Sequence, residues 1–179
     1  LEAAQRSLSQ AQAEWNTRLK NAQKTFDDAL DAYKNVYKGW LGIQLQPLEL
    51  IQSPETLLKK WGVDLDLLFD RTLRFLNLNL FGEAIPAGGL PPDNPSTPWN
   101  EAVVYSWLNL FPGDIVTTCD PKEVNLRITS RRRCISKEMT DAWDAYQSAK
   151  DQLETLQSQA GKAVADGTIG RRLSRSPRC

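Results

Sequence analysis

The chain has 179 residues, of which 41% are apolar and 25% charged, an ordinary composition for a globular protein. Its formal net charge is zero, and this disfavours a nucleic-acid binder, which should carry a basic excess. It contains no histidine, so His-assisted serine or cysteine hydrolases and imidazole-bound zinc or haem are excluded within this chain.

Residues 1–39 predict one long helix. Good helix formers dominate, no proline interrupts them, and the first glycine is Gly39. Apolar residues recur mostly at steps of three and four, as in a heptad repeat: Leu1, Ala4, Leu8, Ala11, Trp15, Ala22, Phe26, Ala29, Tyr33, Val36 and Trp40. The repeat slips by one position near Arg18 and Leu19, where we expect the buried stripe to shift around the helix.

From residue 40 the composition changes to a segment rich in Leu, Trp and Pro, and we expect residues 40–135 to form an inserted head. Ser53 and Pro54 predict the start of a short helix that ends at Gly62. Asp64 or Asp66 is expected to cap the next helix, which runs to about residue 80. Residues 82–98 contain five prolines and three glycines and predict a loop. The last residues of that loop, 97–98, predict the start of another helix.

Residues 115–119 and 124–129 predict two strands joined by a proline-containing turn, which together form a β-hairpin packed on the helices. A disulfide between Cys119 and Cys134 would close a short loop and stabilise the fold by roughly 3 kcal/mol. It would also imply an oxidising compartment. The alternative is two separate thiols in a reducing cytosol, and Cys179 is left over in either case.

Ser136 predicts the start of the last helix, and a second heptad pattern follows it: Met139, Ala142, Tyr146, Ala149, Leu153, Leu156, Ala160 and Ala163. Residues 166–179 carry four arginines and are expected to be a basic disordered tail. The predicted fold is therefore mainly α. Residues 1–39 and 136–165 form a long antiparallel helical hairpin, a coiled-coil-like stalk, with a small helical head inserted at 40–135 that contains one β-hairpin.

No residue set indicates catalysis, a cofactor or a metal. Asp64, Asp66 and Asp70 lie close in sequence, but they do not have the spacing of a calcium loop, and helix capping explains the first two. Glu83 has no identifiable carboxylate partner. We therefore predict no catalytic, cofactor-binding or metal-ligating residue.

Two groups of residues are candidates for binding a partner. Trp61, Trp99 and Trp107 belong to a residue type enriched in binding hot spots, although a small head also needs core tryptophans. Arg131, Arg132 and Arg133 form a basic cluster that could contact an acidic protein patch, a phosphate or an anionic lipid surface. The alternative for the arginines is a solvated turn.

These patterns favour a non-enzymatic, extracytoplasmic structural or interaction protein whose head binds a protein partner, in a pilus, secretion-channel, bacteriocin receptor-binding or virion-type role. The Ala-rich stalk could also form a homo-oligomer. No apolar run is long enough to span a bilayer, so membrane contact would be peripheral. Because residue 1 is Leu, we expect a processed or excised chain. The alternatives are a cytosolic assembly factor that docks through its Leu- and Trp-rich segment, and a carboxylate- or metal-dependent enzyme.

Overall fold

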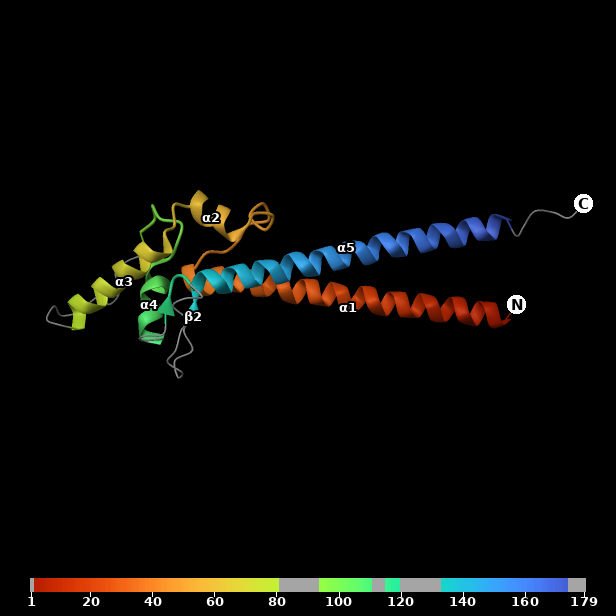
Figure 1. The fold of residues 1–179 in the computed structure, drawn as a ribbon, viewed down its shortest axis with the longest axis horizontal. Helices are drawn as coiled ribbons and strands as arrows, with labels where there is room; N and C mark the ends of the chain where they lie inside the picture. Colours follow the sequence, from red (N-terminus) through yellow and green to blue (C-terminus); the bar gives the residue numbers. More distant parts are fainter. Residues whose placement is uncertain (1, 81–93, 111–114, 120–132, 174–179) are drawn as a thin grey trace, which may run out of the picture. The chain divides into compact units, whose positions relative to one another are not determined.

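The computed structural model describes residues 2–80, 94–110, 115–119 and 133–173, which are mainly helical (Figure 1). In chain order their elements are α1 (Glu2–Leu41), α2 (Pro54–Lys60), α3 (Leu65–Leu80), α4 (Glu101–Leu110), β1 (Ile115–Val116), β2 (Arg133–Cys134) and α5 (Ile135–Leu173). The chain divides into two compact units, residues 1–30 with 145–179 and residues 31–144. Both long helices therefore contribute residues to both units.

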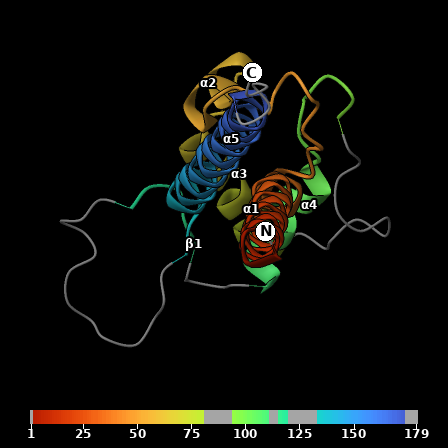
Figure 2. The same cartoon turned by 90° about the vertical axis from the view of Figure 1, so that its right-hand side faces the viewer.

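In the first unit, α1 and α5 pack together, and both views show the two helices side by side (Figures 1 and 2). Phe26 and Tyr146 form a ring contact with centroids 5.6 Å apart. Each helix has a stripe of half-buried or buried residues at steps of three and four: Trp15, Leu19, Ala22 and Phe26 on α1, and Tyr146, Ala149, Leu153 and Leu156 on α5. Near the predicted slip, Leu19 lies in the stripe and Arg18 is exposed, as expected if the apolar position moves by one there.

The second unit has its own core around the end of α1. Tyr33, Tyr37 and Leu41 of α1 are fully buried, as are Leu57 of α2 and Met139 of α5. Tyr33 also meets Trp143 of α5 with ring centroids 5.3 Å apart, so α1 and α5 pack together in this unit as well. Burial of this apolar and aromatic surface is the main term that holds the unit together.

Helix α1 ends at Leu41, two residues beyond the predicted boundary, and Gly42 follows it. Its φ of +69° is a left-handed conformation that favours glycine. A Cβ at this position would lie 2.6 Å from Asn100 Cβ, so a side chain would also collide with the start of α4. The Asn100 amide donates to the Leu41 carbonyl at 2.8 Å, and this bond fixes the start of α4 against the end of α1.

The short helices largely follow their predicted caps. Ser53 caps α2, and Gly62 follows that helix with a φ of +64°. Asp64 caps α3, since its Oδ1 accepts from the Leu67 amide at 3.0 Å. The start predicted for α4 at residues 97–98 is wrong, because Asn100 caps that helix through the Val103 amide at 3.1 Å.

The strands differ from the predicted hairpin. Among the described strands, β1 pairs with β2 in parallel, with Ile115 opposite Arg133, a pairing that the sequence did not predict. The other predicted strand, 124–129, lies outside the described residues. The Ser136 amide donates to the Thr117 carbonyl at 3.3 Å, which continues the contact beyond the ladder into α5.

Helix α5 is longer than predicted. It begins at Ile135 and continues to Leu173, so the disorder expected from residue 166 is wrong as far as Leu173. Residues 174–179 lie outside the described part of the chain. Arg171, Arg172 and Leu173 favour helix, and each of the two glycines, Gly167 and Gly170, costs only about 1 kcal/mol in a helix interior. Across the described ranges, no helix is both long and apolar enough to cross a membrane.

Candidate functional site

A groove of about 370 Å³ lies in the second unit, between α1, α4 and the start of α5. Ala32, Val36 and Gly39 line it from one face of α1, where they follow one another at helical steps of four and three. A Cβ built on Gly39 would meet no atom within 4 Å. The groove therefore exists because one turn of α1 presents small side chains where a larger residue would have filled the space.

Two tryptophans form the inner wall of the groove. Trp40 and Trp107 are 6% and 2% exposed, and their rings meet edge to face with centroids 5.3 Å apart. The Trp107 indole N–H donates to the Trp40 carbonyl at 2.7 Å. The Trp40 indole N–H donates to Glu138 Oε2 at 2.8 Å. Because both polar ends are satisfied internally, this wall is preformed, and the small part of the rings that borders the groove is apolar.

The rim of the groove is polar. Asn35 and Arg133 are exposed, and Ser106 and Glu138 are half-buried. The Ser106 hydroxyl donates to the Val103 carbonyl at 2.6 Å, and Glu138 accepts from Trp40. Within the described residues, the Asn35 amide makes no side-chain hydrogen bond. An apolar floor with a few polar groups at its edge is the usual composition of a binding groove.

The structure brings two of the predicted partner-binding residues to this groove and places the others elsewhere. Trp107 and Arg133 line it, although Trp107 is so deeply buried that a partner would reach little of its ring. Trp61 is half-buried and packs edge to face on Tyr37 at 5.9 Å. Trp99 borders a separate cavity of about 10 Å³ beside α3 and α4. Arg131 and Arg132 lie outside the described residues.

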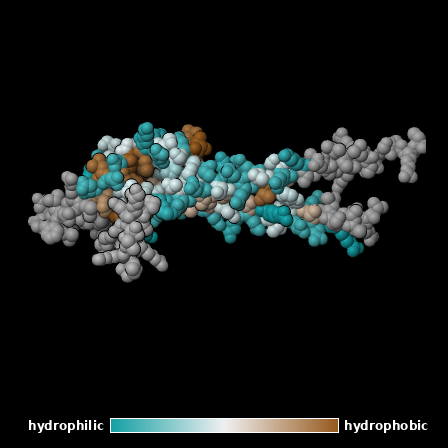
Figure 3. All heavy atoms as spheres, in the orientation of Figure 1, coloured by the Kyte–Doolittle hydropathy of each residue, from teal (hydrophilic) through white to brown (hydrophobic). Residues whose placement is uncertain are grey.

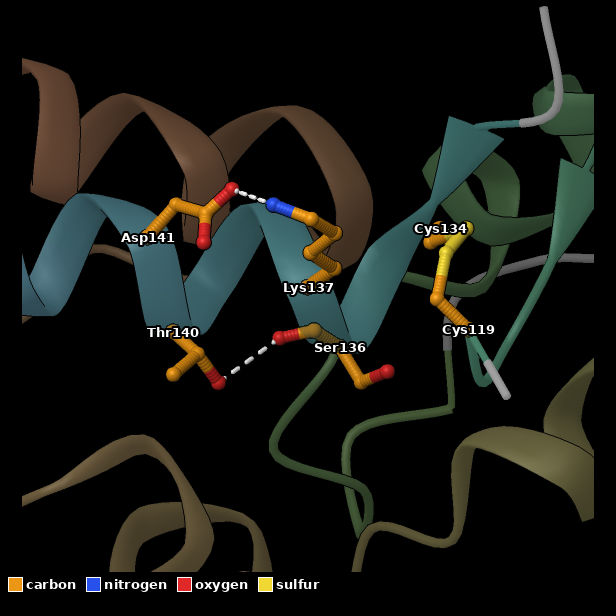
Figure 4. The surroundings of a disulfide bond; sticks show 6 residues. All are labelled: Cys119, Cys134, Ser136, Lys137, Thr140 and Asp141. Carbon is orange, nitrogen blue, oxygen red and sulfur yellow. Dashed lines mark hydrogen bonds and ion pairs between the residues drawn. A yellow bond between two sulfur atoms is a disulfide. The ribbon is translucent and has the colours of Figure 1, made fainter. Parts of the chain in front are cut away.

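Cys119 and Cys134 lie at disulfide-bonding distance, with their Cα atoms 5.4 Å apart (Figure 4). Cys134 ends β2 and directly precedes α5, whose first turns carry the Lys137–Asp141 ion pair and the Thr140 hydroxyl bond to the Ser136 carbonyl. A bond between the two cysteines would fix the backbone next to Arg133. The position of Arg133 at the groove would then be constrained from both sides, by the β1–β2 pairing and by the sulfur bridge.

Sequence reasoning missed Gly39, Asn35 and Glu138 as residues of this site. A signal for the first was present, because a glycine inside a run of good helix formers costs stability and so indicates a local packing or functional reason. Asn35 and Glu138 gave none, since exposed polar residues are ordinary on both helices. Only the fold shows that Glu138 meets Trp40, 98 positions away in sequence.

The acidic residues considered as metal ligands have structural roles. Asp64 caps α3, and Asp66 accepts a hydrogen bond from the Thr117 hydroxyl. No group of three or more Cys, Asp or Glu side chains in the described ranges is placed to hold a metal ion. Glu83 lies outside those ranges.

Two tyrosines of the second unit have perturbed ionisation. Burial, reinforced by a hydrogen bond with Tyr33, raises the pKa of the Tyr37 hydroxyl. Burial and the neighbouring Glu101 carboxylate raise the pKa of Tyr105. Both phenols therefore stay protonated at neutral pH and act as hydrogen-bonding core residues.

Comparison with known proteins gives no relative: no protein-family model matches the chain, and no curated protein or solved structure resembles it significantly.

Proposed function

We propose that this chain is a non-enzymatic interaction protein, in which an antiparallel hairpin of α1 and α5 acts as a stalk and residues 40–135 act as a head that binds a protein partner. The observation that carries the proposal is the preformed groove, with its tryptophan wall and polar rim, in the unit that contains the head. Such a surface suits recognition, since its aromatic groups need no rearrangement before a ligand arrives.

The antiparallel direction of the hairpin is supported by the order of the contacts between its helices. Along α1, Tyr33 meets Trp143, and seven residues later Trp40 bonds to Glu138. The partner positions on α5 fall as those on α1 rise, as an antiparallel pair requires. The matching stripes of buried residues at steps of three and four support coiled-coil-like packing.

The compartment belongs to the same proposal. A bond between Cys119 and Cys134 would form and persist in an extracytoplasmic space, such as that of a pilus, secretion-channel, bacteriocin or virion component. Mass spectrometry of the protein from its source under non-reducing conditions tests this. A tryptic species joining the two cysteines is expected, and two free thiols would contradict an oxidising location.

The partner-binding role is tested by photo-crosslinking with single photoreactive residues in the full chain. Asn35 and Leu48 report on the second unit, and Lys20 and Ser148 are exposed control positions in the first unit. The same partner band should appear from at least one of the first two positions and from neither control. Crosslinks that arise only from Lys20 and Ser148 would show that the first unit, not the second, binds the partner.

A second candidate function, a cytosolic assembly factor, is favoured by a different observation. Leu48 and Ile51 are 76% and 69% exposed on the turn before α2, where Figure 3 shows a hydrophobic patch. A factor that docks through this turn would give crosslinks from Leu48 but not from Asn35, and its cysteines would be reduced.

A further inference from the structure

We infer that the groove between α1, α4 and α5 binds an acidic peptide segment of the partner, with one aliphatic or aromatic side chain inserted and a carboxylate placed beside Arg133. This inference rests on the proposed function and names the partner chemistry that the groove would recognise. Its volume of about 370 Å³ lies within the range of small-ligand sites, which is roughly 300–1,000 Å³.

The floor and wall of the groove select an apolar group. Ala32, Val36 and Gly39 offer aliphatic surface and backbone, and the two largely buried tryptophans add only a small area of ring. Neither indole N–H is available to an incoming acceptor, because Trp107 donates to a carbonyl and Trp40 donates to Glu138. A polar group inserted here would lose its water without gaining a partner, whereas an apolar side chain would lose nothing.

The charges at the rim select an acidic neighbour for that side chain. Arg133 is exposed, and its five N–H donors allow it to hold a carboxylate in addition to its existing contacts. Glu138, the one acidic side chain among the described lining residues, already accepts from Trp40. Next to it, Lys137 is paired with Asp141.

Asn35 favours a peptide rather than an isolated side chain. Its amide offers both a donor and an acceptor, and it makes no side-chain hydrogen bond in the described part of the chain. A peptide backbone presents the complementary pair, an N–H and a carbonyl. The groove therefore combines an apolar slot, a cation and a backbone-matching amide within one surface.

The test uses a random peptide library displayed on phage and selected on the full-length protein. Enriched peptides should pair an aliphatic or aromatic residue with Asp or Glu, and they are then synthesised for affinity measurements. Gly39→Leu fills the slot, and leucine favours helix, so the variant should fold, as circular dichroism will verify. Its affinity for the selected peptides should fall at least about tenfold. Lys24→Glu, on the exposed surface of the first unit, is the matched control and should bind like wild type.

Charge reversal supplies the second arm. Arg133→Glu should weaken the same peptides, and replacing their acidic residue by Lys should restore part of the affinity for this variant. The inference would be overturned if the selected peptides lack an acidic residue or bind Gly39→Leu as well as wild type. It would also be overturned if the selection enriches no peptide. Dimerisation of wild type that Gly39→Leu abolishes would also overturn it, since the occupant would then be a second copy. Equal binding to Gly39→Leu would contradict the groove as the peptide site but not the proposed partner-binding function. The crosslinking experiment tests that function separately.

Discussion

Gly42 is held by two separate constraints that act on one residue. Its positive φ disfavours any side chain, and the Asn100 Cβ stands 2.6 Å from the place where a Cβ would lie. Gly62 has nearly the same φ but no atom within 4 Å of the corresponding position. A side chain would therefore cause backbone strain at both glycines, but it would collide with a neighbour only at Gly42.

Gly42→Ala should therefore be more harmful than Gly62→Ala. We expect the second to lower the free energy of unfolding by about 1 kcal/mol through left-handed strain alone. The first should cost about 1–3 kcal/mol more, because the end of α1 and the start of α4 must separate. Urea unfolding of both variants measures the difference, and equal losses would show that the contact with Asn100 is not tight.

Tyr37 should make the free energy of unfolding fall as the pH rises in the alkaline range. Burial raises its pKa in the folded state above the value of about 10 found in unfolded chains. The folded state then holds the proton more tightly, so the contribution of Tyr37 to stability is complete below pH ~10 and is lost as the pH rises further. Wild type should lose about 1.4 kcal/mol more per pH unit above 10 than Tyr37→Phe. Parallel slopes in denaturant titrations across this range would contradict the burial of the phenol.

At the scale of elements, the pairing of α1 and α5 depends on buried positions such as Leu153, which is 8% exposed in the first unit. Its neighbour Gln152 is exposed. Leu153→Asp should lower the free energy of unfolding by several kcal/mol, through lost burial and an unpaired charge. Gln152→Asp should stay within about 0.5 kcal/mol of wild type. Thermal unfolding compares them, and tolerance of Leu153→Asp would show that this stripe is not buried.

Local sequence patterns predicted most helices. They failed where the structure depends on contacts between residues that are distant in sequence. Caps written in the sequence, Ser53 and Asp64, marked α2 and α3 correctly. Asn100 was missed as a cap because Thr97–Pro98 gives a similar local signal for a helix start. The backbone N–H of Asn100 donates to the Leu41 carbonyl at the end of α1, a contact that the sequence does not indicate. The partner strand of β1 could not be predicted, since period-two alternation says nothing about which strand pairs with which. The groove depends on α1, α4 and α5 meeting, so only Gly39 hinted at it.

At the scale of the whole molecule, the two cysteines are the one covalent link expected between the β1 region and the start of α5. Their separation of 15 residues makes the loop-closure contribution roughly 3 kcal/mol. The double variant Cys119→Ser/Cys134→Ser should lose about this much free energy of unfolding under oxidising conditions. Under reducing conditions it should match wild type. Equal stability of the two proteins without reductant would mean that the bond is not formed.

We propose above all that partner specificity lies in the second unit, residues 31–144, rather than in the first unit. The most direct measurement is the affinity of the crosslinked partner for wild type, for Arg133→Glu and for the first-unit control Lys24→Glu. Arg133 and Lys24 are both exposed, so neither change should disturb folding. We expect binding at least about tenfold weaker for Arg133→Glu and unchanged for the control Lys24→Glu. Unchanged affinity for Arg133→Glu with a loss for Lys24→Glu would contradict the proposal.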